Sequence, residues 1–269
     1  MKDDLVSIII PTFNEAENIS NCLNSIKKQS YNNFEIIVVD NHSTDETTTM
    51  AERFTPKVYT HGPERSSQRN FGAKKAKGKY LLFLDADMQM TKECLSEAID
   101  KIKGKNTIIA FPEKAIGQNF WEKSIALERS LYQKEKLLAG ARLFPEKLFA
   151  KLKGYDENLI AGEDWDITLR AEKLGCELTF TDSFLIHREN AKNLKEILKK
   201  KAYYSRNIKQ YATKHPIEFS KQSGFQKRLG IFLKHFPTLL INPLPAFGFI
   251  FIKLLVWYDW QTKRNNEYS

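Results

Sequence analysis

The sequence has few cysteines and no apolar run long enough to cross a membrane, and both features limit the classes of protein to which it can belong. Only three of its 269 residues are cysteines, and they stand far apart, at Cys22, Cys94 and Cys176. This spacing excludes a disulfide framework and a cysteine-rich metal centre, and it predicts a reducing compartment. No apolar run of suitable length and flanks follows the first four residues, so the sequence predicts no signal peptide.

The longest apolar stretch, residues 236–258, has Lys253 as its only charged residue and is divided by proline. The prolines are Pro237, Pro243 and Pro245. About 13 residues, 246–258, remain uninterrupted, whereas a spanning helix needs roughly 20. The aromatic residues that end the stretch, Trp257, Tyr258 and Trp260, resemble an anchor at a membrane interface.

Basic residues are concentrated just before this stretch. Residues 190–235 contain twelve Lys or Arg and two acids, Glu196 and Glu218. This block therefore has a net charge of +10, whereas the whole chain has a net charge of +9. Such a block indicates an anionic partner, either nucleic acid or a lipid surface. The sequence has no helix-turn-helix, zinc-finger or aromatic RNA-binding signature. We therefore predict an anionic membrane surface bound through residues 192–260, and no nucleic acid.

The first two thirds of the chain alternate short apolar runs with helical patterns. The predicted strands are residues 6–10, 34–40, 79–84, 107–111, 141–144, 177–181 and 184–187. The predicted helices are residues 15–28, 44–54, 65–77, 91–103, 120–136, 164–174 and 194–213, with a linker at 214–222. This alternation predicts an α/β fold with a mostly parallel sheet sandwiched by helices and a C-terminal helical appendage.

Polar clusters follow three of the predicted strands. They are Pro11-Thr12-Phe13-Asn14-Glu15, Asp40-Asn41 and Asp85-Ala86-Asp87. In parallel sheets ligands bind beyond the carboxyl ends of the strands, so the three clusters are expected at one edge. Asp85 and Asp87 can reach one hard cation, Mn²⁺ or Mg²⁺, that leaves positions open for diphosphate oxygens. The alternative is an Asp-rich turn or a helix cap.

Four single residues or residue pairs carry further candidate chemistry, each with a structural alternative. Asp40 can accept a hydrogen bond from a base or ribose, while the alternative is an Asx-turn beside a cap at Asp45. Arg65 and Arg69 could meet a diphosphate, or form an exposed basic helix face. His187 could be a third metal ligand or a structural histidine. Glu163-Asp164 matches the preference for acids at a helix start.

The segments VSIIIPTFNEAENI, FEIIVVDNHSTDETTTMA, RNFGAKKAKGKYLLFLDAD and AGEDWDITLRAEKLG together resemble glycosyltransferase family 2, which has the GT-A fold. The resemblance covers about Val6 to His187. It implies that Thr12, Asn14 and Glu15 border the nucleoside and that Asp40 contacts the base. Many members have a second acid where this chain has Asn41.

The resemblance also implies the reaction. Asp85 and Asp87 match the metal motif, and Asp87 is the more direct ligand. Glu163-Asp164 matches the acidic pair in which the aspartate is the catalytic base. Members are inverting transferases, which implies a single displacement at the anomeric carbon of a nucleotide-sugar, with UDP as the expected nucleotide.

The tail resembles that of members that build polysaccharides or lipid-linked glycans. We therefore expect a catalytic domain at 1–190, with a nucleotide-binding half at 1–112 and an acceptor half at 113–190, and a membrane-associating tail at 191–269. The expected location is the cytoplasmic membrane face, peripheral or monotopic, and the expected acceptor is a glycan or lipid-linked glycan. The alternatives are a polyprenyl-phosphate glycosyl transferase, a nucleotidyltransferase, and a basic binding protein without enzymatic activity.

Overall fold

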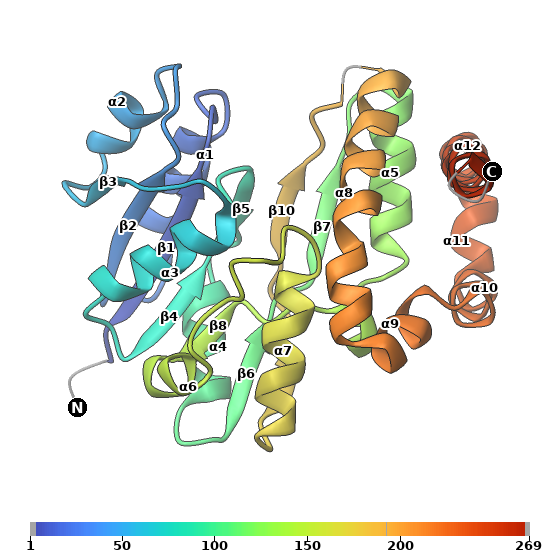
Figure 1. Cartoon of the computed structure of the whole chain (residues 1–269). Coiled ribbons are helices and arrows are strands. Elements are labelled where there is room, and N and C mark those ends of the chain that lie inside the picture. Colours follow the sequence, from blue (N-terminus) through green and yellow to red (C-terminus); the bar gives the residue numbers. More distant parts are fainter. Residues whose placement is uncertain (1–3, 192, 267–269) are drawn as a thin grey trace. The chain divides into compact units, whose positions relative to one another are not determined.

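The chain folds into two compact units, which are described separately (Figure 1). The computed structural model describes residues 4–191 and 193–266, with side chains except at 225 and 259–266. The first unit consists of the chain up to Pro112 and Lys134–His187, and the second of Glu113–Gln133 and the chain from Arg188 onward. The division into a catalytic domain at 1–190, with halves at 1–112 and 113–190, and a tail at 191–269 stays a prediction.

The first unit is built on a seven-stranded sheet in the order β3-β2-β1-β4-β8-β6-β9. Its strands are β1 (Val6–Thr12), β2 (Phe34–Asp40), β3 (Val58–Thr60), β4 (Tyr80–Phe83), β6 (Thr107–Ala110), β8 (Leu143–Pro145) and β9 (Glu177–Phe180). All neighbouring pairs are parallel except those of β8, which is antiparallel to β4 and β6. The predicted fold class, an α/β protein with a mostly parallel sheet, is confirmed.

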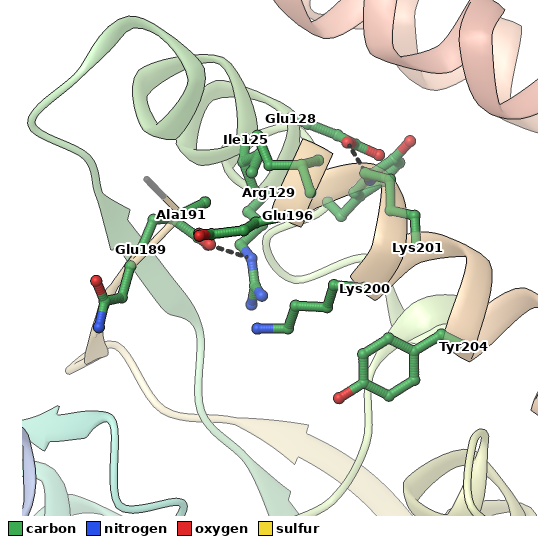
Figure 2. A pocket seen from close by; sticks show the side chains of 12 residues that line it. Ile125, Glu128, Arg129, Glu189, Ala191, Glu196, Lys200, Lys201 and Tyr204 are labelled. Carbon is green, nitrogen blue, oxygen red and sulfur yellow. Dashed lines mark hydrogen bonds and ion pairs between the residues drawn. The ribbon is translucent and has the colours of Figure 1, made fainter. Parts of the chain in front are cut away.

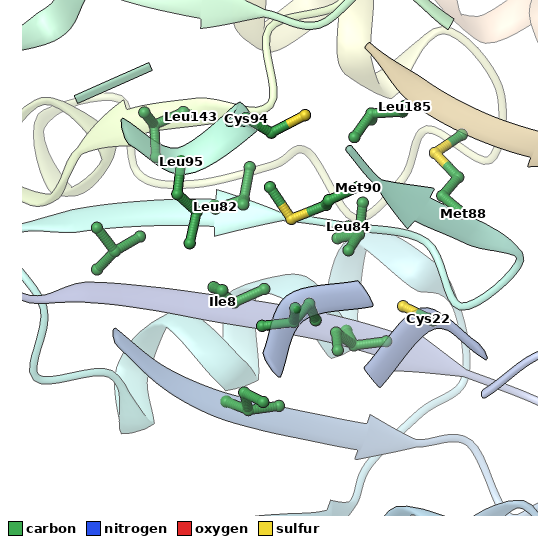
Figure 3. Close-up of a cluster of buried hydrophobic side chains, with 14 of the residues drawn as sticks. Ile8, Cys22, Leu82, Leu84, Met88, Met90, Cys94, Leu95, Leu143 and Leu185 are labelled. Carbon is green, nitrogen blue, oxygen red and sulfur yellow. The ribbon is translucent and has the colours of Figure 1, made fainter. Parts of the chain in front are cut away.

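Helices cover both faces of this sheet because its central strands are apolar on both sides. In β1, Ile8 and Ile10 face one apolar cluster and Ile9 the other, and all three are fully buried. The first cluster packs against α1 (Ile19–Lys27), α2 (Thr47–Glu52) and α4 (Cys94–Ile102); part of it is drawn in Figure 3. The second packs against α3 (Arg65–Lys75), α6 (Glu146–Lys151) and α7 (Glu163–Lys173).

Two short strands extend the first unit beyond the main sheet. β5 (Met88–Met90) follows directly after Asp87 and pairs antiparallel with β10 (Leu185–Arg188). Their register places His187 opposite Met88. Since Met88 is adjacent to Asp87 in the chain, this pairing brings His187 beside the predicted metal motif.

The second unit is mainly helical. It contains β7 (Glu113–Ile116), α5 (Phe120–Ser130), α8 (Leu194–Lys214), α9 (Pro216–Ser223), α10 (Phe225–Lys234), α11 (Phe236–Ile241) and α12 (Pro243–Asn266). A capping box formed by Asn119 and Glu122 begins α5. Helix α12 packs closely against α5 because Gly248 has no side chain: a Cβ there would lie 2.2 Å from Ser124 Oγ.

The predicted linker at 214–222 is wrong: most of it forms α9, with Pro216 in its first turn. Proline fits the first turn of a helix because its missing N–H has no partner there. For the same reason Pro237 and Pro243 stand at the beginnings of α11 and α12. No helix in the described part of the chain is long and apolar enough to cross a membrane. The Trp260 side chain, part of the predicted anchor, and residue 192 lie outside the described part.

Candidate active site

The loops that follow β1 and β2 interlock at the carboxyl edge of the sheet. Asn14, whose backbone is left-handed with φ 52°, accepts a hydrogen bond from the Thr44 backbone N–H at 2.9 Å. The Asn14 backbone N–H donates to Ser43 Oγ at 2.8 Å, and that of Glu15 donates to Thr47 Oγ1 at 2.8 Å. The predicted gathering of the first two polar clusters at one edge is therefore observed.

Asp40 is buried at the centre of this loop pair. Its carboxylate accepts hydrogen bonds from Thr12 Oγ1 at 3.0 Å and from the Ser43 backbone N–H at 2.8 Å. In the β1–β2 register, Pro11 lies opposite Val39 and Thr12 opposite Asp40. The bond from the Ser43 N–H spans three residues, one more than an Asx-turn, and through it Asp40 holds the loop that would border a nucleoside.

Asp45 and Asn41 lie near Asp40 in the chain, and Asp45 differs in detail from its predicted role as a helix cap. Asp45 precedes α2 by two residues, and its carboxylate accepts from the Thr47 N–H at 3.0 Å instead of occupying the cap position, which is Glu46. Asn41 Nδ2 donates to the Pro63 carbonyl at 2.5 Å, and this bond fixes the next loop.

Arg69 on α3 joins the metal motif to the acidic pair on α7. Its Nη2 donates to Asp85 Oδ1 at 2.7 Å, and its Nη1 donates to Asp164 Oδ1 at 3.1 Å and to Glu163 Oε1 at 3.3 Å. Arg69 is fully buried, so it is not part of an exposed basic face. One guanidinium can serve three carboxylates because its five N–H donors form a planar fork.

This network sets the charge states of its members. Burial acts to lower the pKa of Arg69, but Asp164 and Asp85 raise it well above the usual value. Burial acts to raise the pKa of Asp85, but Arg69 and Arg142 outweigh it and hold this pKa well below the usual range. Arg142 Nη1 donates to Asp85 Oδ2 at 3.0 Å, so each carboxylate oxygen of Asp85 accepts from an arginine.

The two acids at the start of α7 differ in accessibility. The Glu163 side chain is 6% exposed, and burial together with Asp164 raises its pKa against the effects of Arg65 and Arg69. The Asp164 side chain is 29% exposed, and its Oδ2 has no partner among the described residues. Asp164 is therefore the member of the pair that a substrate can reach.

Gly140 makes room for Asp164. A Cβ at Gly140 would lie 2.6 Å from the Asp164 Cβ, closer than real Cβ atoms approach their neighbours. In addition, Thr168 Oγ1 donates to the Asp164 carbonyl at 2.6 Å and accepts from the Ala141 N–H at 2.8 Å. The segment before β8 is thus fitted against the first turn of α7.

Asp87 and His187 form a second polar pair in this unit. His187 Nε2 lies 2.9 Å from Asp87 Oδ2, and the His187 side chain is buried. No cluster of three or more His, Cys, Asp or Glu side chains suited to a metal occurs in the described residues. Asp87 and His187 supply a carboxylate oxygen and an imidazole nitrogen, a donor pair for a first-row divalent cation.

The sequence analysis missed four residues that organise this site. The first is Arg142, which pairs with Asp85. The second is Tyr155, whose ring centroid lies 5.1 Å from the Arg69 guanidinium. The third is Gln68, whose Nε2 donates to the carbonyls of Thr12 and Val39. Gly140 is the fourth. Arg142, a charged residue in an apolar run, was the only local signal. Arg65, predicted near a diphosphate, lies 3.3 Å from Glu163 Oε1.

Comparison with known proteins agrees with this architecture. Glycosyl transferase family 2 matches residues 7–150, more than half of the chain, and the chain belongs to this family. It is 29% identical to Glycosyltransferase AglE of Haloferax volcanii over 213 residues, 72% of this chain and 70% of that protein. It is 31% identical over 192 residues to poly(ribitol-phosphate) beta-N-acetylglucosaminyltransferase TarS of Staphylococcus aureus.

The fold is also that of solved members. The structure of S. aureus TarS 1-349 in complex with UDP-GlcNAc matches with a TM-score of 0.53 and 23% identity over 76% of this chain and 66% of that chain. At this identity the likeness shows the fold, which is the GT-A fold. The chain spans 32% of the TarS sequence and 39% of the longer TarS structure, so it corresponds to only part of these relatives.

Proposed function

We propose that this chain is an inverting glycosyltransferase that moves a sugar from a UDP-sugar to a hydroxyl of a glycan or lipid-linked glycan. The observation that carries the proposal is the bridge made by Arg69 between Asp85 and Asp164. The bridge joins Asp85, which follows β4, to Asp164, the more exposed acid of the pair that begins α7. A donor site and a base for the acceptor are needed together in a direct displacement.

The reaction follows from the roles of these residues. Asp164 Oδ2 takes the proton of the acceptor hydroxyl while the acceptor oxygen forms a bond to the anomeric carbon. The bond from that carbon to the phosphate oxygen breaks, and its electron pair leaves with the nucleoside diphosphate. Attack and departure take place on opposite sides of the carbon, so the configuration inverts. Arg69 orients Asp164 through Oδ1 and leaves Oδ2 for the acceptor.

Asp87 and His187 would hold a divalent cation, Mn²⁺ or Mg²⁺. When bound, the cation would neutralise the charge that develops on the departing diphosphate. Asp85 was expected to share this role. Because both of its oxygens accept from arginines, we assign it to positioning Arg69 and assign direct ligation to Asp87 and His187. The remaining positions of the cation would be filled by the donor and by water.

The nucleotide is proposed from the loops after β1 and β2 and from the relatives. The TarS structure in complex with UDP-GlcNAc supports a UDP-sugar as donor. In this chain the corresponding edge of the sheet presents the loops of Asn14 and Asp40, which hydrogen bonds hold in place. A preformed edge of this kind binds a nucleoside at a low ordering cost.

The test of the proposed reaction is Asp164→Asn. We expect transfer to fall by about 10²- to 10⁴-fold, because an amide cannot take a proton. UDP binding, measured by calorimetry, should stay unchanged. Glu163→Gln is the matched control for charge loss at the same helix start. Normal transfer by Asp164→Asn would exclude Asp164 as the base. If that variant still acted on bare polyprenyl phosphate, the reaction would be that of a polyprenyl-phosphate transferase, whose acceptor needs no base.

A membrane surface is proposed as the place of this reaction. Exposed apolar side chains recur at helical spacing along α12, at Leu244, Phe247, Phe251, Leu254 and Tyr258. On α11, Leu240 and Ile241 are exposed as well. The basic block of residues 190–235 precedes α12, and apolar side chains beside basic ones are typical of interfacial helices. This combination supports peripheral or monotopic binding at the cytoplasmic face of the membrane.

Vesicle flotation tests the membrane proposal. The chain should float with phosphatidylglycerol vesicles and much less with phosphatidylcholine vesicles, and salt should weaken the binding. Ile241→Asn combined with Leu244→Asn should reduce flotation several-fold, since each variant removes apolar surface from contact with lipid. Leu174→Asn, at an exposed leucine of the first unit, is the matched control. Equal losses in both variants would contradict membrane docking through α11 and α12.

A further inference from the structure

The second unit contains a pocket that the proposed reaction does not use. It is lined by α5, by residues 189–191 and by α8, and its volume is about 300 Å³ (Figure 2). Small-molecule sites begin at about this size. Ile125 and Ile197 contribute apolar wall, and the remaining lining is largely charged or aromatic. The pocket therefore suits a small polar ligand.

Three hydrogen-bond donors from two helices converge on this pocket. Figure 2 shows the side chains of Arg129 from α5 and of Lys200 and Tyr204 from α8 pointing into the same space. A guanidinium and an ammonium can only donate, and a phenol can donate. A ligand that accepts from all three needs several oxygens close together and a negative charge, as a phosphate group has.

Two of the three carboxylates that line the pocket, those of Glu128 and Glu189, are paired with named cations. Glu189 Oε1 lies 2.6 Å from Arg129 Nε. Glu128 pairs with Lys201 at 3.1 Å and with Lys253 from α12. Lys200, in contrast, has no ion-pair partner within the described ranges 4–191 and 193–266. Its charge is therefore available to a ligand.

The helix that supplies Lys200 adds to this attraction. Helix α8, Leu194–Lys214, carries seven Lys or Arg and one acid, Glu196. The resulting positive potential favours an anion in the pocket. One lining residue, Glu189, is also close in sequence to the candidate active site, because it follows the proposed metal ligand His187 by two residues.

We propose that this pocket binds a phosphoester anion that carries a sugar or a glycerol, with Lys200 and Tyr204 as the ligand-contacting residues. Such a group occurs in phosphate-containing or lipid-linked glycan acceptors and in the headgroups of anionic phospholipids. The first source deepens the proposed function, because it identifies the acceptor class, and to that extent the inference rests on the proposed function. The second source makes the pocket a lipid site.

The experiment titrates the full chain with glycerol 3-phosphate and with glycerol by calorimetry. Glycerol 3-phosphate should bind and glycerol should not. Lys200→Gln and Tyr204→Phe should each weaken binding, the former by about tenfold or more, because a hydrogen bond to a charged group is lost. The neighbours Lys199→Gln and Tyr203→Phe are matched controls, since neither residue lines the pocket. UDP binding is measured in parallel and should be normal in all four variants.

A second arm measures binding to phosphatidylglycerol vesicles. If Lys200→Gln alone loses binding of glycerol 3-phosphate, the natural ligand is the phosphate of an acceptor. If Lys200→Gln alone loses binding of vesicles and keeps that of glycerol 3-phosphate, the natural ligand is a lipid headgroup. Equal losses in Lys199→Gln and Lys200→Gln would overturn the pocket, because they would reflect the general charge of α8. Absence of binding in both arms would overturn it too. Normal UDP binding would then leave the proposed transferase intact, whereas loss of UDP binding alone would count against the transferase.

Discussion

Arg69 and Asp164 are 95 residues apart in the chain, yet Arg69 Nη1 donates to Asp164 Oδ1 at 3.1 Å. The same guanidinium donates to Asp85, so its position fixes two proposed parts of the site at once. A buried arginine is costly unless its charge is compensated. Here three carboxylates accept from Nη1 and Nη2, while Nε has no hydrogen-bond partner among the described residues. The ion pairs therefore maintain the geometry that the proposed reaction needs.

Replacing Arg69 by lysine should damage both stability and transfer. A lysine keeps the charge but cannot bridge Asp85 and Asp164, and a carboxylate left without its partner in the interior costs about 3–5 kcal/mol. We expect a lower melting temperature and a loss of transfer of about 10²-fold or more, because the base loses its orientation. Arg53→Lys, at an exposed position beyond α2, is the control. Wild-type melting and kcat in Arg69→Lys would show that the bridge is dispensable.

Removal of either proposed metal ligand should weaken cation binding. Asp87→Ala and His187→Ala should each weaken Mn²⁺ binding by at least tenfold, measured by calorimetry in the presence of UDP. Transfer should fall with EDTA and return with added Mn²⁺. Asp182→Ala removes an exposed carboxylate and serves as the control. Mn²⁺ binding of equal strength in all three variants would place the cation elsewhere.

A methyl group at Gly140 should displace Asp164. A Cβ at Gly140 would lie 2.6 Å from the Asp164 Cβ, so one of the two segments must move. We expect Gly140→Ala to lower kcat about tenfold or more and to leave UDP binding unchanged, because only the proposed base shifts. A Cβ at Gly230, on α10, would meet nothing within 4 Å, so Gly230→Ala should leave transfer unchanged. Unchanged kcat in Gly140→Ala would mean that α7 adapts without loss.

Glu128 should make the stability of the chain depend on acid pH. Burial acts to raise its pKa, but Lys201 and Lys253 hold this pKa at about 2, below the ordinary 4.5. Because the pKa of Glu128 is lower in the folded chain than in the unfolded chain, the stabilisation by its ion pairs is complete above about pH 4.5. It is lost as the pH falls toward 2, and it amounts to about 3 kcal/mol.

Chemical denaturation between pH 7 and pH 2 measures this contribution. Glu128→Gln should lower the free energy of unfolding at pH 7 and make its decline below pH 4.5 shallower than in the wild type. Glu146→Gln, at an exposed position on α6, is the matched control. If the free energy of unfolding of Glu128→Gln falls with pH as steeply as that of the wild type, Glu128 is not the cause of the acid dependence.

Much of the first unit could be predicted because its signals are local. The segments FEIIVVD and VSIII are short and rich in β-branched apolar residues, and they form β2 and the greater part of β1. The turn after α7 was equally visible, since Gly175 has the positive φ of 83° that glycine tolerates. The linker assigned to 214–222 failed because Pro216 was taken as a break, whereas proline in a first turn begins a helix.

The sequence by itself determined the alternation of strands and helices, the family motifs, and the placing of polar clusters after apolar strands. These depend on periodicities within a few residues and on the rule that parallel strands end at one edge. Only the tertiary structure decided that Arg69 is buried among three acids, that His187 lies beside Asp87, and that Gly140 accommodates Asp164. Those relationships depend on the pairing of β10 with β5 and on the packing of α7 near β8. The register of segments distant in the chain is set by the whole core and not by any local run of residues.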